Sequence, residues 1–293
     1  MAAMDDTHLP PLFAALVDDA GLFPPERLPM AAALARHRAD AVAGHGVLTH
    51  RFLCPASRLD ELRAELGATE ALRLGLIVDT GLGAVAEAVA DVSADARLRL
   101  ETVEVALAAA PDPAAAPDLA VVAERVAPEL AALDARVFAE LPVAGGWRGA
   151  LATLAAHGVG AKVRCGGVRA ELFPSGQQLA AFVVTAAGHE VPCKATAGLH
   201  HAVRHRDPAT GFDHHGFLNL LLAACRAVEG GDVAEVRATL ALEDAGTLAA
   251  QARSVPAATA AHARRLLVAY GSCSTSEPID DLVALRLIPE NTR

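Results

Sequence analysis

The alternation of short β-branched apolar runs with longer segments rich in Ala, Leu, Arg and Glu limits the fold of this chain more than any other feature. Strands buried on both faces of a parallel sheet have such nearly continuous apolar runs, and helices connect them. Eight runs of this kind occur, at residues 12–17, 47–53, 72–78, 98–107, 136–141, 159–164, 191–195 and 266–270. The sequence therefore predicts an α/β fold, a single (β/α)8 TIM barrel.

The segments between these runs are predicted to be helical. They cover residues 30–42, 59–66, 119–133, 149–157, 176–187, 216–229, 233–252 and 279–287. Several have capping residues at their starts: Ser57 or Asp60, Ser175, and Ser274 with Glu277 three residues later. The 293 residues suit one barrel domain of roughly 250 residues or more, covering 1–293, with a Pro/Ala-rich loop at 108–117 and a His-rich loop at 199–215.

Charge and composition exclude several classes of protein. The net charge of −10 and pI near 5.6 argue against a nucleic-acid partner, which needs a basic face. No apolar run approaches the ~20 residues of a membrane span, and residues 1–10 show no cationic region before an apolar stretch, so neither a secreted nor a membrane-spanning protein is expected. The five cysteines are widely spaced and suit a reducing compartment. We expect a cytoplasmic protein that binds a small molecule and makes no membrane contact. Many soluble enzymes form symmetric dimers, so a homo-oligomer is compatible with this expectation.

Only two of the 25 basic residues are lysines, which leaves 23 arginines. A guanidinium does not deprotonate in proteins, whereas a buried lysine can act as a base or as a Schiff-base nucleophile. Lys162 and Lys194 each lie near the carboxyl end of a predicted strand, where barrel active sites form. On neighbouring strands the amines would be roughly 5 to 10 Å apart, so one charge is expected to lower the pKa of the other amine. The alternative is that both lysines are structural ion-pair partners.

Two further charged residues end predicted strands. Glu140 is a candidate general acid or base, and a salt bridge to Arg164 explains it equally well. Arg164 shares strand parity with Lys162, so both side chains should point the same way. A guanidinium there is a candidate clamp for a substrate carboxylate or phosphate.

Glycine-bearing loops follow the last three predicted strands. Their candidate substrate-binding residues are Gly166, Gly167, Gly198, Gly271, Ser272 and Ser274. Barrels often bind phosphate through backbone N–H groups of the loops after the last two strands. Glycine is also the ordinary residue of a tight turn, so this assignment competes with a structural one.

Histidines gather in one loop, at positions 200, 201, 205, 214 and 215. They show no His-x-His or His-Glu-x-x-His spacing, so no metal site and no cofactor are predicted. His200 is retained as a candidate substrate contact, with loop packing as the alternative. Asp18 and Asp19, near the first predicted strand, are candidates for binding a substrate hydroxyl or for capping a turn.

Three segments carry a family resemblance: Lys162-Val-Arg-Cys-Gly-Gly167, Lys194-Ala-Thr-Ala-Gly198 and Gly271-Ser-Cys-Ser274. They resemble two lysine segments and a Gly-x-Ser phosphate loop of class I, Schiff-base-forming aldolases of the deoxyribose-phosphate aldolase type. The resemblance covers the C-terminal half only, and it departs from the family at Arg164 and in the histidines that follow Leu199. It implies that Lys162 forms the Schiff base, that Lys194 lowers its pKa, and that Glu140 stands near an acidic position of the family.

These observations favour an enzyme, a lyase of aldolase type that acts on a small carbonyl substrate bearing a phosphate or a carboxylate. One alternative is a non-covalent barrel isomerase or lyase that uses a lysine as base. Another is a non-catalytic barrel that binds a sugar phosphate or carboxylate. A metal-dependent hydrolase is the remaining alternative, which elemental analysis would detect.

Overall fold

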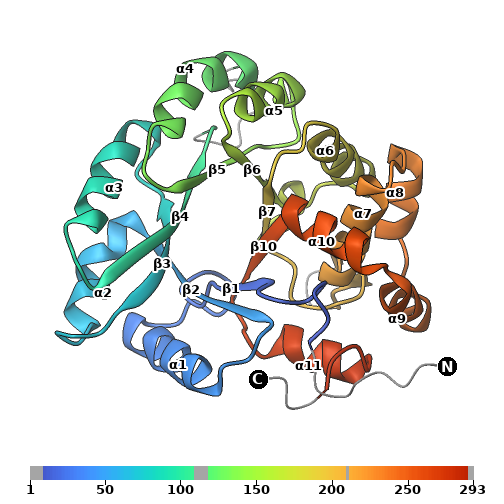
Figure 1. The fold of residues 1–293 in the computed structure, drawn as a ribbon, viewed down its shortest axis with the longest axis horizontal. Coiled ribbons are helices and arrows are strands. Elements are labelled where there is room, and N and C mark those ends of the chain that lie inside the picture. Colours follow the sequence, from blue (N-terminus) through green and yellow to red (C-terminus); the bar gives the residue numbers. More distant parts are fainter. Residues whose placement is uncertain (1–8, 109–117, 209–210, 290–293) are drawn as a thin grey trace.

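The computed structural model describes residues 9–108, 118–208 and 211–289, and its centre is a closed barrel of parallel strands (Figure 1). Neighbours around the barrel follow the order β1, β2, β3, β4, β5, β6, β7 and β10, and β10 closes the barrel against β1. The strands are β1 (Val17–Asp19), β2 (Leu48–Pro55), β3 (Leu72–Val78), β4 (Leu98–Ala106), β5 (Arg136–Glu140), β6 (Gly160–Arg164), β7 (Cys193–Thr196) and β10 (Leu267–Ser272). The predicted (β/α)8 fold is confirmed.

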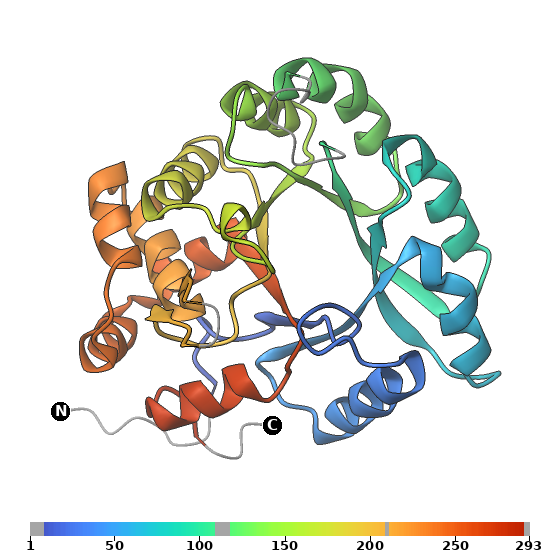
Figure 2. The same ribbon diagram turned by 180° about the vertical axis from the view of Figure 1, so that it is seen from behind.

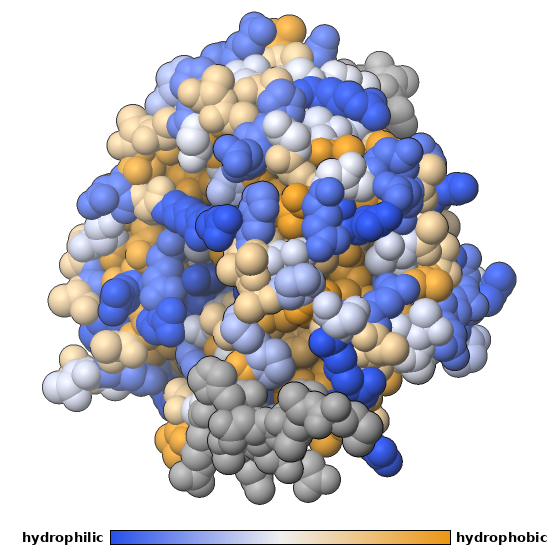
Figure 3. All heavy atoms as spheres, turned by 45° about the vertical axis from the view of Figure 1, so that its right-hand side comes forward, coloured by the Kyte–Doolittle hydropathy of each residue, from blue (hydrophilic) through white to orange (hydrophobic). Residues whose placement is uncertain are grey.

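Helices surround the barrel, and Figures 1 and 2 show this outer ring from opposite sides. They are α1 (Met30–Ala43), α2 (Leu59–Glu65), α3 (Val85–Ser93), α4 (Leu119–Ala131), α5 (Trp147–Ala156), α6 (Gly176–Gly188), α7 (Phe217–Val228), α8 (Val233–Leu240), α9 (Ala245–Ser254), α10 (Ala257–Leu266) and α11 (Glu277–Ala284). Figure 3 shows hydrophilic and apolar side chains interspersed over one side of this layer. Nowhere in the described ranges does a helix have the length and apolar character needed to cross a membrane.

Several elements differ from the sequence-based expectation. The first strand was predicted at residues 12–17, but residues 11–15 form turns and the strand is β1. Asp18 and Asp19 therefore lie within the first strand, not after it. The helix expected over 233–252 is two helices, since Asp244 accepts a hydrogen bond from the Thr247 amide and starts α9. Helices α3 and α10 were not predicted. The long histidine-containing loop holds a short hairpin of β8 (His205–Arg206) and β9 (Asp213–His214).

The predicted caps are partly confirmed. Ser175 and Gln178 form a reciprocal capping box at the start of α6. Ser274 Oγ accepts a hydrogen bond from the Glu277 amide at 3.2 Å, at the start of α11. At α2 neither predicted residue caps the helix, because Ser57 is bonded to Asp79 instead. Most of the Pro/Ala-rich loop, residues 109–117, lies outside the described residues.

Alternating side chains of each strand separate the barrel interior from the helix layer. On β6, Ala161 and Val163 belong to the apolar core under the helices, and Lys162 lies between them in sequence. On β7, Cys193 and Ala195 face that same core, which leaves Lys194 on the opposite side of the strand. This alternation directs both lysines into the barrel.

Candidate active site

Lys162 and Lys194 are paired in register on β6 and β7, and both amines contact one carboxylate, that of Glu104 on β4. The Lys162 Nζ to Glu104 Oε2 distance is 2.7 Å, and Lys194 donates a short hydrogen bond to Glu104 Oε1. Strand β4 is not a neighbour of β6 or β7, so these contacts cross the barrel interior. The two amines therefore converge on one point inside the barrel.

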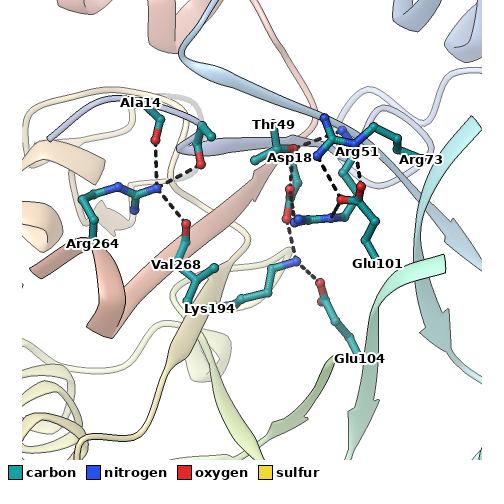
Figure 4. A network of polar contacts seen from close by, with 11 residues as sticks. Ala14, Asp18, Thr49, Arg51, Arg73, Glu101, Glu104, Lys194, Arg264 and Val268 are labelled. Carbon is teal, nitrogen blue, oxygen red and sulfur yellow. Dashed lines mark hydrogen bonds and ion pairs between the residues drawn. The ribbon is translucent and has the colours of Figure 1, made fainter. Parts of the chain in front are cut away.

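From Lys194 the charges continue toward β1 and β2. Lys194 Nζ lies 2.5 Å from Asp18 Oδ2, and Asp18 Oδ1 accepts hydrogen bonds from Arg51 at 2.8 Å and from Thr49 at 2.6 Å (Figure 4). Asp18 thus binds a lysine and an arginine of the protein. The neighbouring Asp19 turns to α1 instead, where it accepts a hydrogen bond from Arg36 at 2.6 Å.

From Lys162 the charges continue toward the carboxyl ends of the strands. Lys162 Nζ lies 3.0 Å from Glu140 Oε2, and Arg164 Nε donates to Glu140 Oε1 at 3.2 Å. Exposed side-chain fractions rise along this path, from 1% for Lys194 to 7% for Lys162 and 41% for Arg164. From the Arg164 side, solvent therefore reaches Lys162 before Lys194.

Together these residues form an alternating chain of charges, which we call the lumen charge chain. Its members, in spatial order, are Arg51, Asp18, Lys194, Glu104, Lys162, Glu140 and Arg164. Every inner member has an opposite charge on each side, which offsets the cost of removing it from water. The salt bridge expected between Glu140 and Arg164 is present as one contact of this chain.

The pKa of Lys162 is raised, contrary to the expectation that a second amine would lower it. Burial alone would lower the pKa of this amine, but the negative charges of Glu104 and Glu140 outweigh burial. The sequence-based expectation is wrong because carboxylates lie around Lys162 Nζ, including one between the two lysines. The pKa of Glu140 is lowered, since Lys162 and Arg164 together outweigh its burial.

Burial would raise the pKa of Glu104, but the charges of Lys162 and Lys194 lower it to about 2 from its ordinary 4.5. A carboxylate with a depressed folded-state pKa stabilises the fold above its unfolded pKa, and that stabilisation is lost as the pH falls. The shift corresponds to about 3 kcal/mol at neutral pH.

We therefore expect the free energy of unfolding to fall as the pH drops through the interval from 4.5 to about 2. Urea titrations at a series of pH values would measure it. Glu104→Gln should remove much of this pH dependence, because the amide does not titrate. An acid-induced loss of the same size in the variant and the wild type would assign the effect to other groups.

At the predicted glycine positions, the neighbouring backbone or side chains lie so close that a Cβ atom would contact them. A Cβ on Gly166 would meet the Gly198 Cα at 2.9 Å, and Gly198 has a φ of +70°, so both positions require glycine. A Cβ on Gly167 would meet Leu172 at 2.5 Å. At the end of β10, a Cβ on Gly271 would meet Leu53 of β2 at 3.2 Å.

The two serines and His200 lie around the end of β10. The Ser272 hydroxyl is buried without a hydrogen-bond partner in the described structure. Ser274 Oγ accepts the hydrogen bond from the Glu277 amide described above, although the residue at the N-cap of α11 is Ser276. His200 Nδ1 lies 3.3 Å from Glu277 Oε2 and 3.6 Å from Cys273 Sγ. Burial raises the pKa of the Cys273 thiol to about 11, so this pair does not supply a thiolate at neutral pH.

His201, His205 and His214 pack among themselves and with an aromatic ring, whereas His215 Nε2 lies 2.7 Å from the Pro174 carbonyl oxygen. His205 lies against His201 and His214, with ring centroids 5.0 and 5.2 Å apart, and Phe173 contacts His214 at 4.8 Å. Within the described ranges, no group of three or more His, Cys, Asp or Glu residues has a geometry that could hold a metal ion.

Sequence reasoning missed Glu104, the residue that both lysines share, and Arg51. One signal was present: Glu104 is an acidic residue within the apolar run of β4, where a buried charge needs a partner. Its partners are 58 and 90 residues away in sequence.

No family model matches the sequence, and comparisons with curated proteins and with solved structures give no match. The likeness to class I aldolases therefore depends on the three segments quoted above.

Proposed function

We propose that this protein is a lyase of aldolase type that binds a small carbonyl compound as a Schiff base on Lys162. One observation carries the proposal: both lysines contact the buried Glu104, and Lys162 is the one nearer the open end of the barrel. A carboxylate between two amines is ionised and can accept a proton from one of them while the other stays positively charged.

The proposed reaction moves one proton between two groups in contact. The Lys162 ammonium gives a proton to Glu104; because the pKa of Lys162 is raised and that of Glu104 is lowered, this transfer is uphill and the neutral amine is a minor species. The neutral amine adds to the substrate carbonyl to form a carbinolamine. Glu104 then returns the proton to the carbinolamine hydroxyl, which leaves as water. The products are a protonated Schiff base on Lys162, one water molecule and the Glu104 carboxylate, so charge and atoms balance.

Neighbouring groups support this step. Lys194 is held between Asp18 and Glu104 and is only 1% exposed, which suits a fixed charge better than a nucleophile. Glu140 contacts Lys162 from the open side and can move a proton on the bound substrate. Arg164, partly exposed beside it, can bind a substrate phosphate or carboxylate.

Borohydride trapping tests the proposal. The protein is incubated with acetaldehyde, pyruvate or dihydroxyacetone phosphate, reduced with borohydride, and analysed by intact mass and peptide mapping. The chain has only two lysines, so an adduct is assigned to Lys162, Lys194 or the N-terminal amine. We expect it on Lys162.

Lys162→Arg and Lys194→Arg are the matched variants, since arginine keeps the positive charge but forms no Schiff base. Trapping should disappear in the first and persist in the second. Absence of any Lys162 adduct across a broad set of aldehydes and ketones would overturn the proposal.

One observation favours a second candidate, a non-covalent isomerase or lyase. The raised pKa keeps Lys162 positively charged at neutral pH, where an ammonium can stabilise an enolate while Glu140 removes the proton. This candidate predicts exchange of substrate protons with solvent without a trapped adduct.

A further inference from the structure

A cavity of about 470 Å³ lies at the end of the barrel opposite the lumen opening near Arg164. Its walls include Arg136, the first residue of β5, and Pro192, which directly precedes β7. Val268, near the start of β10, also lines it. These positions are at the amino ends of the strands, whereas Glu140 and Arg164 end β5 and β6. The cavity is therefore separate from the candidate active site.

Positive charge predominates in the walls of this cavity. Arg136, Arg264 and Arg265 line it together with His262, and Glu190 is the acidic residue among the lining side chains. This excess is unusual for a chain with a net charge of −10. We call Arg136, Arg264 and Arg265 the basal arginines.

Two basal arginines have no carboxylate partner within the described part of the chain. Arg136 packs over the Phe138 ring, with its Cζ 5.2 Å from the centroid. Burial lowers the pKa of Arg136, and the positive charge of Arg51 lowers it further. Arg265 has a single long hydrogen bond of 3.4 Å, to the Ala261 carbonyl in its own helix. Both guanidinium groups therefore retain free donors.

The third basal arginine, Arg264, is held by backbone carbonyls. It donates to Ala14 and Val268, as Figure 4 shows, and also to Ala15 and Leu267. Its Nε is buried without a hydrogen-bond partner in the described structure. Burial lowers the pKa of Arg264 to about 10, since carbonyl dipoles do not replace a full negative charge.

Some arginines elsewhere in the molecule are paired with acids. Arg36, Arg51 and Arg73, for example, each contact a carboxylate oxygen within 2.8 Å. This cavity groups three guanidinium groups that have no carboxylate contact within the described residues, so an oxyanion bound there could accept hydrogen bonds from several of them at once. Its volume is in the range of small-molecule sites, roughly 300–1,000 Å³.

We propose that this cavity binds a small multivalent oxyanion, a compound bearing phosphate or several carboxylates, through the basal arginines. Such an anion would accept bidentate hydrogen bonds from Arg136 and Arg265 and would place negative charge beside Arg264. The proposal does not depend on the reaction at Lys162.

Titration calorimetry with pyrophosphate and with citrate tests the proposal, with sodium chloride at matched ionic strength as the control for screening. We expect saturable binding of at least one anion and a rise in melting temperature with its concentration. The pyrophosphate and citrate arms distinguish a phosphate from a carboxylate ligand.

Variants locate the site. Arg136→Gln and Arg265→Gln should each weaken binding about tenfold or more, and both positions are solvent-exposed, so the fold should tolerate them. Arg125→Gln, exposed on α4, is the matched control and should leave binding unchanged. Binding lost in Arg164→Gln but kept in Arg136→Gln would assign the anion to the other end of the barrel and overturn the proposal. Absence of saturable binding at millimolar concentrations would overturn it as well.

Discussion

Replacement of Lys194 by methionine is expected to lower the free energy of unfolding by about 3–5 kcal/mol. The side chain is 1% exposed, and its amine contacts Asp18 Oδ2 and Glu104 Oε1. Methionine fills a similar volume but carries no charge, so the buried Asp18 and Glu104 carboxylates each lose the positive charge of Lys194. Urea unfolding at neutral pH, followed by circular dichroism, measures the change.

A double variant separates lost charge from lost packing. Glu104→Gln combined with Lys194→Met removes two adjacent opposite charges, which leaves Arg51 paired with Asp18 and Lys162 paired with Glu140. We expect the double variant to be more stable than the sum of the single changes predicts, by up to about 3 kcal/mol.

Arg38→Met is the surface control for the loss of charge. Arg38 pairs with Glu70 and is 42% exposed, so its loss should cost about 1 kcal/mol or less. A cost of the same size for Lys194→Met would contradict the account of the lumen charge chain as a set of mutually dependent buried charges.

The barrel was predictable because its strands have a local signature. Runs such as Leu72–Val78 are apolar apart from the exposed Arg73, as a strand covered on both faces over most of its length requires, and β3 has the predicted bounds. The first strand was misplaced because apolar residues such as Leu12 and Phe13 are buried in turns, not in β1. Burial of apolar residues is common to strands and turns, so composition does not separate them.

The candidate site was only half predictable, for a different reason. Strand parity predicted that Lys162 and Arg164 point to one side of β6, and both contact Glu140; the Glu140–Arg164 salt bridge was one of the two alternatives left open for Glu140. The pairing of Lys194 with Glu104 joins residues 90 positions apart across the closed barrel. Such a contact depends on barrel closure and on the register between strands, which no local pattern specifies. The direction of the Lys162 pKa shift was missed because it depends on this pairing.

The proton-transfer role proposed for Glu104 leads to the second large effect. With a suitable carbonyl substrate, Glu104→Gln should lower the maximal rate of Schiff-base formation by about 10²–10⁴-fold, the usual contribution of a positioned acid or base. The same change removes one of two negative charges that raise the pKa of Lys162. Schiff-base formation should therefore level off at a lower pH than in the wild type.

Glu140→Gln provides the matched comparison, because Glu140 contacts the same amine from the open side. It should also move the pH profile to lower pH, since it too removes a negative charge near Lys162. The maximal rate of Schiff-base formation should stay within about tenfold of the wild type, because Glu104 remains to transfer the proton. Rates of borohydride trapping measured across the pH range give both quantities. A larger fall in maximal rate for Glu140→Gln than for Glu104→Gln would assign the proton transfer to Glu140, the residue that the sequence analysis favoured. Glu104 would then be a fixed charge between the two lysines.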